Sequence, residues 1–422
     1  PPVVAARHSQ ETGVLRVFTR SFIDDSSRLD LGKPTQDVDG AVLINLGSPV
    51  SSRTDTAALA ALAASRPVLI GEPDAADHIR EAAVELGAYR TAVARAEASK
   101  ADWVAVRELR ERSAMAGQAL DSLLDDLYAG AGTCWSSIDP EGRVRLIDPD
   151  GPTSISAVLS DICDARFPDT PLLRNEMLSR RVLTSQGAKA RRNLLEAMIS
   201  HIGEPRCGIE GYPPERAMYE ALLGATGIHR ERDGHLTFGD PGEADRYKYR
   251  SAWAALNAFL DSTAGEAATV EDLYTHLMAP PVGLKEGPIP VLLVAALIAR
   301  ADDVALYETG SFVPRLDVPT MERLIRNPDL FALRSFNLRG PRQELAERLA
   351  TALGGTPHAP RGLRVPSVVA AMRPLVTRIR AVPKYALQTR SLDPTTRAVR
   401  DAILAATEPD TLLFETIPAC FG

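Results

Sequence analysis

The sequence predicts an α+β protein that is mainly helical, with a small N-terminal α/β unit followed by helical and winged-helix-like modules. Three observations support this fold class. Short apolar runs bounded by Gly and Pro alternate with helical segments near the N-terminus. Pro-poor segments with helical periodicity fill most of the middle of the chain. Short helices and short strands then alternate over residues 270–338.

The small α/β unit is expected to cover residues 1–90. Residues 14–23 roughly alternate apolar and polar side chains, as a half-buried strand does. Residues 41–46 and 67–71 are short apolar runs, and a helical segment at 55–64 separates them. A further helix is expected from Asp74. Strands separated by helices predict a parallel sheet.

Four further segments follow in order. Residues 91–130 have mixed-sign charges on a helical repeat, which predicts one long helix or a helical hairpin. The Gly-, Pro- and Asp-rich residues 130–155 indicate a domain boundary. Residues 150–265 are expected to form a helical domain, 266–340 a winged-helix-like module, and 360–422 a C-terminal helical segment. Asp393 and Pro394 are typical of the start of a helix.

Composition limits the class of protein. The chain has 422 residues, a net charge of −7 and 45% hydrophobic residues, as in soluble globular proteins. Its four cysteines lie far apart, which argues against zinc and favours a reducing, cytoplasmic setting. The charge-free run 288–299 is too short for a membrane span and predicts a buried helix. The first residue is not Met, as expected of a piece of a longer polypeptide, although processing would look the same.

Catalytic and cofactor motifs are not found in the sequence. Neither SQGAK (185–189) nor GLKEG (283–287) has the spacing of a phosphate-binding loop, so no cofactor is expected in this chain, and ATP only in a longer parent protein. His229 and His235 flank a predicted turn at Asp233-Gly234. A proton-transfer or metal site there is a weaker interpretation than a surface hairpin. No catalytic residue and no metal ligand is therefore predicted.

Two basic clusters are the candidate binding residues. Residues 172–198 contain six cations and two acids, Glu176 and Glu196, within two helices joined by a short link. Such cations could contact phosphates, or they could form a solvated face or partner acids elsewhere. The six are Arg174, Arg180, Arg181, Lys189, Arg191 and Arg192.

The second cluster is more strongly basic. Residues 361–400 contain nine cations and one acid, a net charge of +8, so the remainder of the chain carries −15. Phosphates and an acidic protein surface are equally good ligands for a cluster dominated by Arg. The residues expected to bind are Arg373, Arg378, Arg380, Lys384 and Arg390.

Several phrases of the sequence resemble a known group of proteins. They include ARHSQETGVLRVF, TPLLRNEMLSRR, GIEGYPPERAMY, APPVGLKEGPIPVLLVAALIA, VALYETGSFVP and RSLDPTTRAVRDAILAATEPDTLLFETIP. They are similar to the region that follows the P-loop motor in large bacterial phage-defence ATPases, of the BREX type and related systems. The resemblance implies a cytoplasmic, winged-helix-containing body that acts with DNA-modifying or DNA-cleaving partners. It implies no catalytic residues, because the motor motifs are missing here.

Together these observations predict a non-catalytic body or fragment of an antiphage or DNA-processing ATPase. It would bind DNA through both clusters and contact other subunits of a defence complex. No membrane association is expected. Two alternatives stay open. One is a structural oligomerisation module, a homo-oligomer included, that does not touch DNA. The other is an enzyme whose site is not recognised from the sequence.

Overall fold

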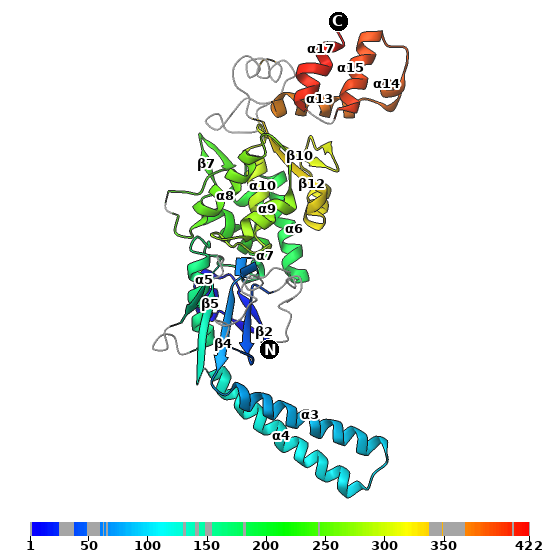
Figure 1. The fold of residues 1–422 in the computed structure, drawn as a ribbon. Coiled ribbons are helices and arrows are strands. Elements are labelled where there is room, and N and C mark those ends of the chain that lie inside the picture. Colours follow the sequence, from blue (N-terminus) through cyan, green and yellow to red (C-terminus); the bar gives the residue numbers. More distant parts are fainter. Residues whose placement is uncertain are drawn as a thin grey trace. The chain divides into compact units, whose positions relative to one another are not determined.

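The computed structural model describes residues 2–24, 38–48, 60–61, 63–64, 66–129, 132–139, 143–147, 154–179, 183–243, 245–336, 348, 368–406 and 409–421. The chain divides into two compact units, unit 1 (Pro1–Pro168) and unit 2 (Asp169–Gly422). The fold is α+β and mainly helical, with 56% of the structure in helices and a small mixed sheet at the N-terminus. The predicted fold class is therefore confirmed (Figure 1).

Unit 1 is built on a six-stranded sheet in the order β1-β2-β3-β4-β5-β6. The strands are β1 (Val3–Val4), β2 (Val17–Ile23), β3 (Gly40–Asn45), β4 (Val68–Pro73), β5 (Thr133–Ile138) and β6 (Val144–Leu146). The strands β2, β3 and β4 are parallel neighbours, whereas the outer pairings are antiparallel. The parallel pairing of β3 with β4 is the one that the sequence predicted. Every residue of β3 is buried, which explains its uninterrupted apolar sequence.

Two helices cover the core of unit 1, α1 (Ala6–Thr12) and α5 (Ile155–Arg166). Ser154 begins α5 by accepting a hydrogen bond from the Ala157 N–H at 3.2 Å. Leu159 and Cys163 of α5 belong to the same buried cluster as Phe18 of β2. The sequence placed this helix in the following helical domain, but the structure assigns it to unit 1, so the division falls after Pro168.

A long helical hairpin is inserted between β4 and β5. It consists of α3 (Ala76–Ala98) and α4 (Trp103–Ala129), which pack side by side (Figure 1). The sequence predicted one long helix or a hairpin over residues 91–130. A hairpin is observed, but it begins at Ala76, so the predicted boundary after residue 90 falls inside α3. Leu86 of α3 and Ala116 of α4 are buried, and Ile79 and Leu127 join the core cluster of the sheet and α5.

The first half of unit 2 is mainly helical, as predicted. Its principal helices are α6 (Ser185–Ser200), α7 (Pro214–Tyr219), α8 (Tyr249–Ser262), α9 (Val270–Met278) and α10 (Ile289–Ala299). A short hairpin joins β7 (His229–Arg232) to β8 (His235–Phe238) around the predicted turn. The helix α10 is apolar on all sides and ten of its eleven residues are buried, which confirms the buried helix.

A four-stranded sheet follows, in the order β11-β10-β12-β9. Its strands are β9 (Ala268–Thr269), β10 (Val304–Glu308), β11 (Ser311–Phe312) and β12 (Phe331–Ser335), all antiparallel to their neighbours. The helix α11 (Val318–Arg326) lies between β11 and β12 in the chain. Helices α9 and α10 separate β9 from β10, an order that suits a winged-helix-like module. That assignment stays a prediction.

The C-terminal segment is helical and packs on this sheet. Its helices are α13 (Val368–Ala381), α14 (Lys384–Gln388), α15 (Pro394–Ala405), α16 (Pro409–Thr411) and α17 (Ile417–Ala419), with a π-helical turn at Leu412–Thr416. Met372 and Leu412 share a buried cluster with Phe312 and Phe336. Asp393 caps α15, accepting from the Thr396 N–H at 2.9 Å, as predicted. Among the residues described above, no helix is both long and apolar enough to cross a membrane.

Candidate nucleic-acid interface

The helix α6 carries half of the first basic cluster, and its local sequence explains how it presents those cations. Thr184 caps the helix by accepting from the Gly187 N–H at 3.2 Å. Leu194, Leu195 and Met198 are buried and form the predicted apolar stripe. Lys189 and Arg192 lie off this stripe and are exposed.

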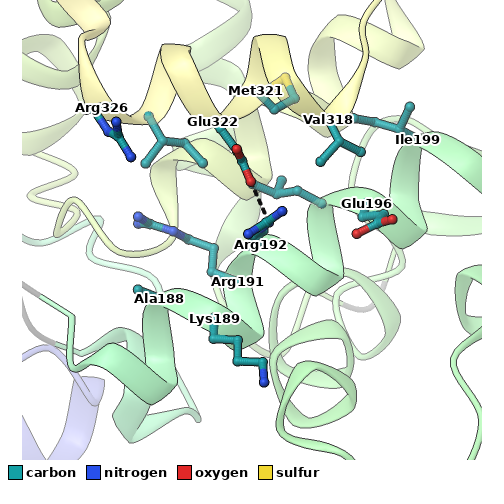
Figure 2. Close-up of a pocket in the computed structure, with 12 residues that line it drawn as sticks. Ala188, Lys189, Arg191, Arg192, Glu196, Ile199, Val318, Met321, Glu322 and Arg326 are labelled. Carbon is teal, nitrogen blue, oxygen red and sulfur yellow. Dashed lines mark ion pairs between the residues drawn. The ribbon is translucent and has the colours of Figure 1, made fainter.

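A groove of about 500 Å³ separates α6 from α11, both within unit 2 (Figure 2). Apolar side chains from both helices, among them Leu195 and Met321, form part of its lining. The charged lining residues carry a formal charge of +2. They are Lys189, Arg191, Arg192 and Glu196 of α6, and Glu322 and Arg326 of α11.

One ion pair crosses this groove. The Arg192 Nε lies 2.5 Å from the Glu322 Oε1, as the dashed line in Figure 2 shows. Both side chains are substantially exposed, at 58% and 40%, so solvent screening limits the pair to about 0–1 kcal/mol of stability. Lys189 points away from α11, which places its ammonium group at the rim of the groove.

Arg191 is partly committed to the fold. Its Nη1 donates a hydrogen bond to the Gly287 carbonyl oxygen at 3.2 Å. Its Nε is buried without a hydrogen-bond partner among the described residues. Burial lowers the pKa of Arg191, against the opposing effects of Tyr274 and Glu286. Arg191 therefore supplies positive charge to the wall of the groove while fixing the backbone at Gly287.

The rest of the first cluster is not brought to this groove. Arg174 is exposed on the irregular segment that precedes α6 and does not line the groove. Arg180 and Arg181 lie outside the described residues. Arg326 also lines the groove but was not among the residues predicted from the sequence, because it lies on a helix far along the chain. A signal was present, because Arg323 and Arg326 form a basic last turn on a strongly amphipathic α11.

The second cluster is only partly described. Arg378 of α13, Lys384 of α14 and Arg390, which follows α14, are exposed. Nothing is described of the side chains of Arg373 and Arg380. Arg400, a neighbouring cation, is structural. Its Nη1 donates to the Thr389 carbonyl oxygen at 2.8 Å, and its Nη2 lies 2.7 Å from the Asp401 carboxylate.

The two histidines of the β7–β8 hairpin lie in different surroundings. His229 is buried, its Nε2–H donates to the Ile202 carbonyl oxygen at 2.8 Å, and its Nδ1 accepts from the Tyr219 hydroxyl at 2.8 Å. Burial lowers the pKa of His229, consistent with this neutral tautomer. His235 is exposed and lies opposite Arg232 in the β7–β8 pairing. The two histidines therefore do not converge.

The nearby Cys207 thiol is buried. The Cys207 Sγ lies 3.8 Å from the His229 Nδ1, but burial raises the pKa of Cys207 to about 12, so little thiolate forms at neutral pH. Across the described part of the chain, no group of three or more His, Cys, Asp or Glu side chains could hold a metal ion. No protein-family model, no curated protein and no solved structure matches this chain.

Proposed function

We propose that this chain is the non-catalytic body of a bacterial phage-defence or DNA-processing complex, and that it binds DNA phosphates in the groove between α6 and α11. The observation that carries the proposal is that Arg191 and Arg326 line one groove, with Lys189 at its rim. These residues come from helices more than a hundred positions apart. A local positive charge on a chain of net −7 favours a specific anionic ligand over general attraction to polyanions.

The chemistry of the groove suits phosphate oxygens. Guanidinium groups present paired N–H donors that match phosphate geometry, and the Lys189 ammonium adds a mobile donor at the rim. Phosphate contacts set affinity and position, whereas base contacts set sequence preference. We therefore expect binding that depends on salt more than on DNA sequence.

The buried state of α10 supports the same expectation. In helix-turn-helix proteins, the recognition helix places its exposed side chains in the major groove. The helix α10 holds the corresponding place in the predicted winged-helix-like module, and ten of its eleven residues are buried. It has no polar face with which to contact base edges. Sequence-specific reading by this helix is therefore not expected.

The test is the affinity of the purified chain for a labelled DNA duplex at 50 and 200 mM salt. Lys189→Glu/Arg326→Glu should weaken binding and reduce the slope of log affinity against log salt by about one unit per lost contact. Arg246→Glu/Lys248→Glu is the matched control, because both side chains are exposed on unit 2 but lie outside the groove. Equal losses in both double variants would refute the assignment of the groove.

A second candidate function is an assembly module without DNA contact. It is favoured by the cations that already have partners within the chain, namely Arg192 with Glu322 and Arg400 with Asp401. Failure to bind the duplex at 50 mM salt would support this candidate. Arg378→Glu/Arg390→Glu, measured in the same titration, tests whether the C-terminal cluster contributes to DNA affinity.

A further inference from the structure

The α3–α4 hairpin of unit 1 separates its charges along its length. Four intramolecular ion pairs, Asp77–Arg80, Glu97–Arg110, Arg107–Glu111 and Glu108–Arg112, leave other charges without a pair in this fully described segment. The half next to the sheet retains the acids Glu81, Glu85, Asp121, Asp125 and Asp126. The half next to the turn at 99–102 retains the cations Arg90, Arg95 and Lys100 and one acid, Asp102.

One face of the hairpin combines this charge separation with an apolar centre. On α3, Glu81, Ala88 and Arg95 follow one another at intervals of seven residues. On α4, Arg112, Met115 and Asp126 follow at intervals of three and eleven. Spacings of three, seven and eleven residues keep side chains on one side of a helix. Arg112 also interacts with the Tyr89 side chain, so the two rows border the same side of the seam. We name these six residues the Met115 face.

The Met115 face is accessible and has a large side chain at its centre. Met115 is 70% exposed, and Ala88, at the same level on α3, is also exposed. At a rise of about 1.5 Å per residue, Arg95 lies about 10 Å from Ala88 toward the turn, and Glu81 lies about 10 Å from Ala88 toward the sheet. A surface that is acidic on one side of its centre and basic on the other is complementary to itself after a half-turn.

We propose that a second copy of this chain docks on the Met115 face, with the two hairpins antiparallel about a two-fold axis at the level of Ala88 and Met115. Each Arg95 then faces Glu81 of the other copy, Asp126 on the adjacent helix of that copy adds negative charge at the same end, and the two Met115 side chains meet near the axis. In a two-fold interface the same patch is used by both copies, so each favourable charge pair occurs twice.

The size of the face is adequate for a specific dimer. A hairpin whose shorter helix has 23 residues is about 35 Å long and about 20 Å wide. Burying one such face on each copy covers about 1,400 Å² in total, within the range of stable interfaces. A central Met contributes adaptable apolar contact, and the surrounding charges fix the direction of pairing.

Sedimentation equilibrium of the full chain tests the proposal through charge exchange. Arg95→Glu places like charges opposite each other at both symmetric positions, and so does Glu81→Arg/Asp126→Arg. Each variant alone should be monomeric at concentrations where the unchanged chain is dimeric. An equimolar mixture of the two variants should form dimers again, because both positions then hold opposite charges.

The matched controls carry the same charge changes on the other side of the hairpin. Arg90→Glu and Asp121→Arg/Asp125→Arg are expected to leave the dimer unchanged, and far-ultraviolet circular dichroism checks that all variants keep their helix content. A monomeric unchanged chain would overturn the proposal, as would dimers that resist Arg95→Glu. Failure of the mixture to associate would overturn the antiparallel arrangement. Loss of dimers in the controls alone would place the contact on the opposite face.

Discussion

His229→Ala is expected to destabilise unit 2 strongly. The imidazole is buried and bonds the Tyr219 hydroxyl and the Ile202 carbonyl oxygen. Its removal takes these hydrogen bonds from the buried Tyr219 hydroxyl and the part-buried Ile202 carbonyl oxygen, and a buried group left without a partner costs about 1–3 kcal/mol. Phe238, whose ring centroid lies 4.7 Å from that of His229, also loses a packing partner. We expect a loss of about 3–5 kcal/mol in the free energy of unfolding.

Urea denaturation measures this loss, with amide hydrogen exchange of residues 229–238 as a local probe of the hairpin. Tyr219→Phe should cost about 1–3 kcal/mol, because it removes only the donor to the His229 Nδ1. The double variant should cost less than the sum of the two single variants, since the residues share one hydrogen bond. His235→Ala is the control on the same hairpin, and an exposed side chain there should change stability by less than about 0.5 kcal/mol.

One result would refute this structural role. If His229→Ala unfolded at the same urea concentration as the unchanged chain, the two hydrogen bonds would not stabilise the fold. A catalytic role for His229 would then need to be tested directly.

Three further predictions concern stability, pH and the groove. Burial lowers the pKa of His8 from its usual 6.5, so the unfolded chain takes up the proton more readily than the folded chain. The free energy of unfolding of unit 1 should therefore fall as the pH drops below about 6.5. His8→Gln should remove that pH dependence. An added Cβ at Gly287 would lie 2.6 Å from a backbone carbonyl oxygen, so Gly287→Ala should lower the free energy of unfolding, measured with urea, by about 1–3 kcal/mol. Gly265→Ala is the control and should cost much less, because a Cβ there meets nothing within 4 Å. Glu322→Gln should change stability by less than about 1 kcal/mol because its pair with Arg192 is exposed, yet it should raise the affinity of the groove for duplex DNA; unchanged affinity would count against the phosphate site.

Local signals in the sequence predicted much of the secondary structure. The capped start of α15 at Asp393, the apolar stripe of α6 and the uniformly apolar α10 were all confirmed. The parallel pairing of β3 with β4 also followed from the helical segment predicted between them. These features depend on neighbours within a few positions, or on the rule that parallel strands need a crossover connection.

The same local signals did not predict where unit 1 ends and unit 2 begins. The helix α5 looks like the start of the second half of the chain, but its buried residues Leu159 and Cys163 complete the core under the N-terminal sheet. A Gly- and Pro-rich segment can be a loop within one unit as well as a linker between two. Only the long-range contacts distinguish these cases.

The sequence by itself determined which residues are cations and which helix faces are apolar, because composition and periodicity are properties of the chain. Only the tertiary structure decided what the cations do. It set Lys189 and Arg326 on one groove, bonded Arg191 to the Gly287 backbone and paired Arg192 with Glu322. It also separated His229 from His235 by burying one and exposing the other. The physical reason is that charge and hydrogen-bond partners are chosen by proximity in space, which the packing of distant helices creates.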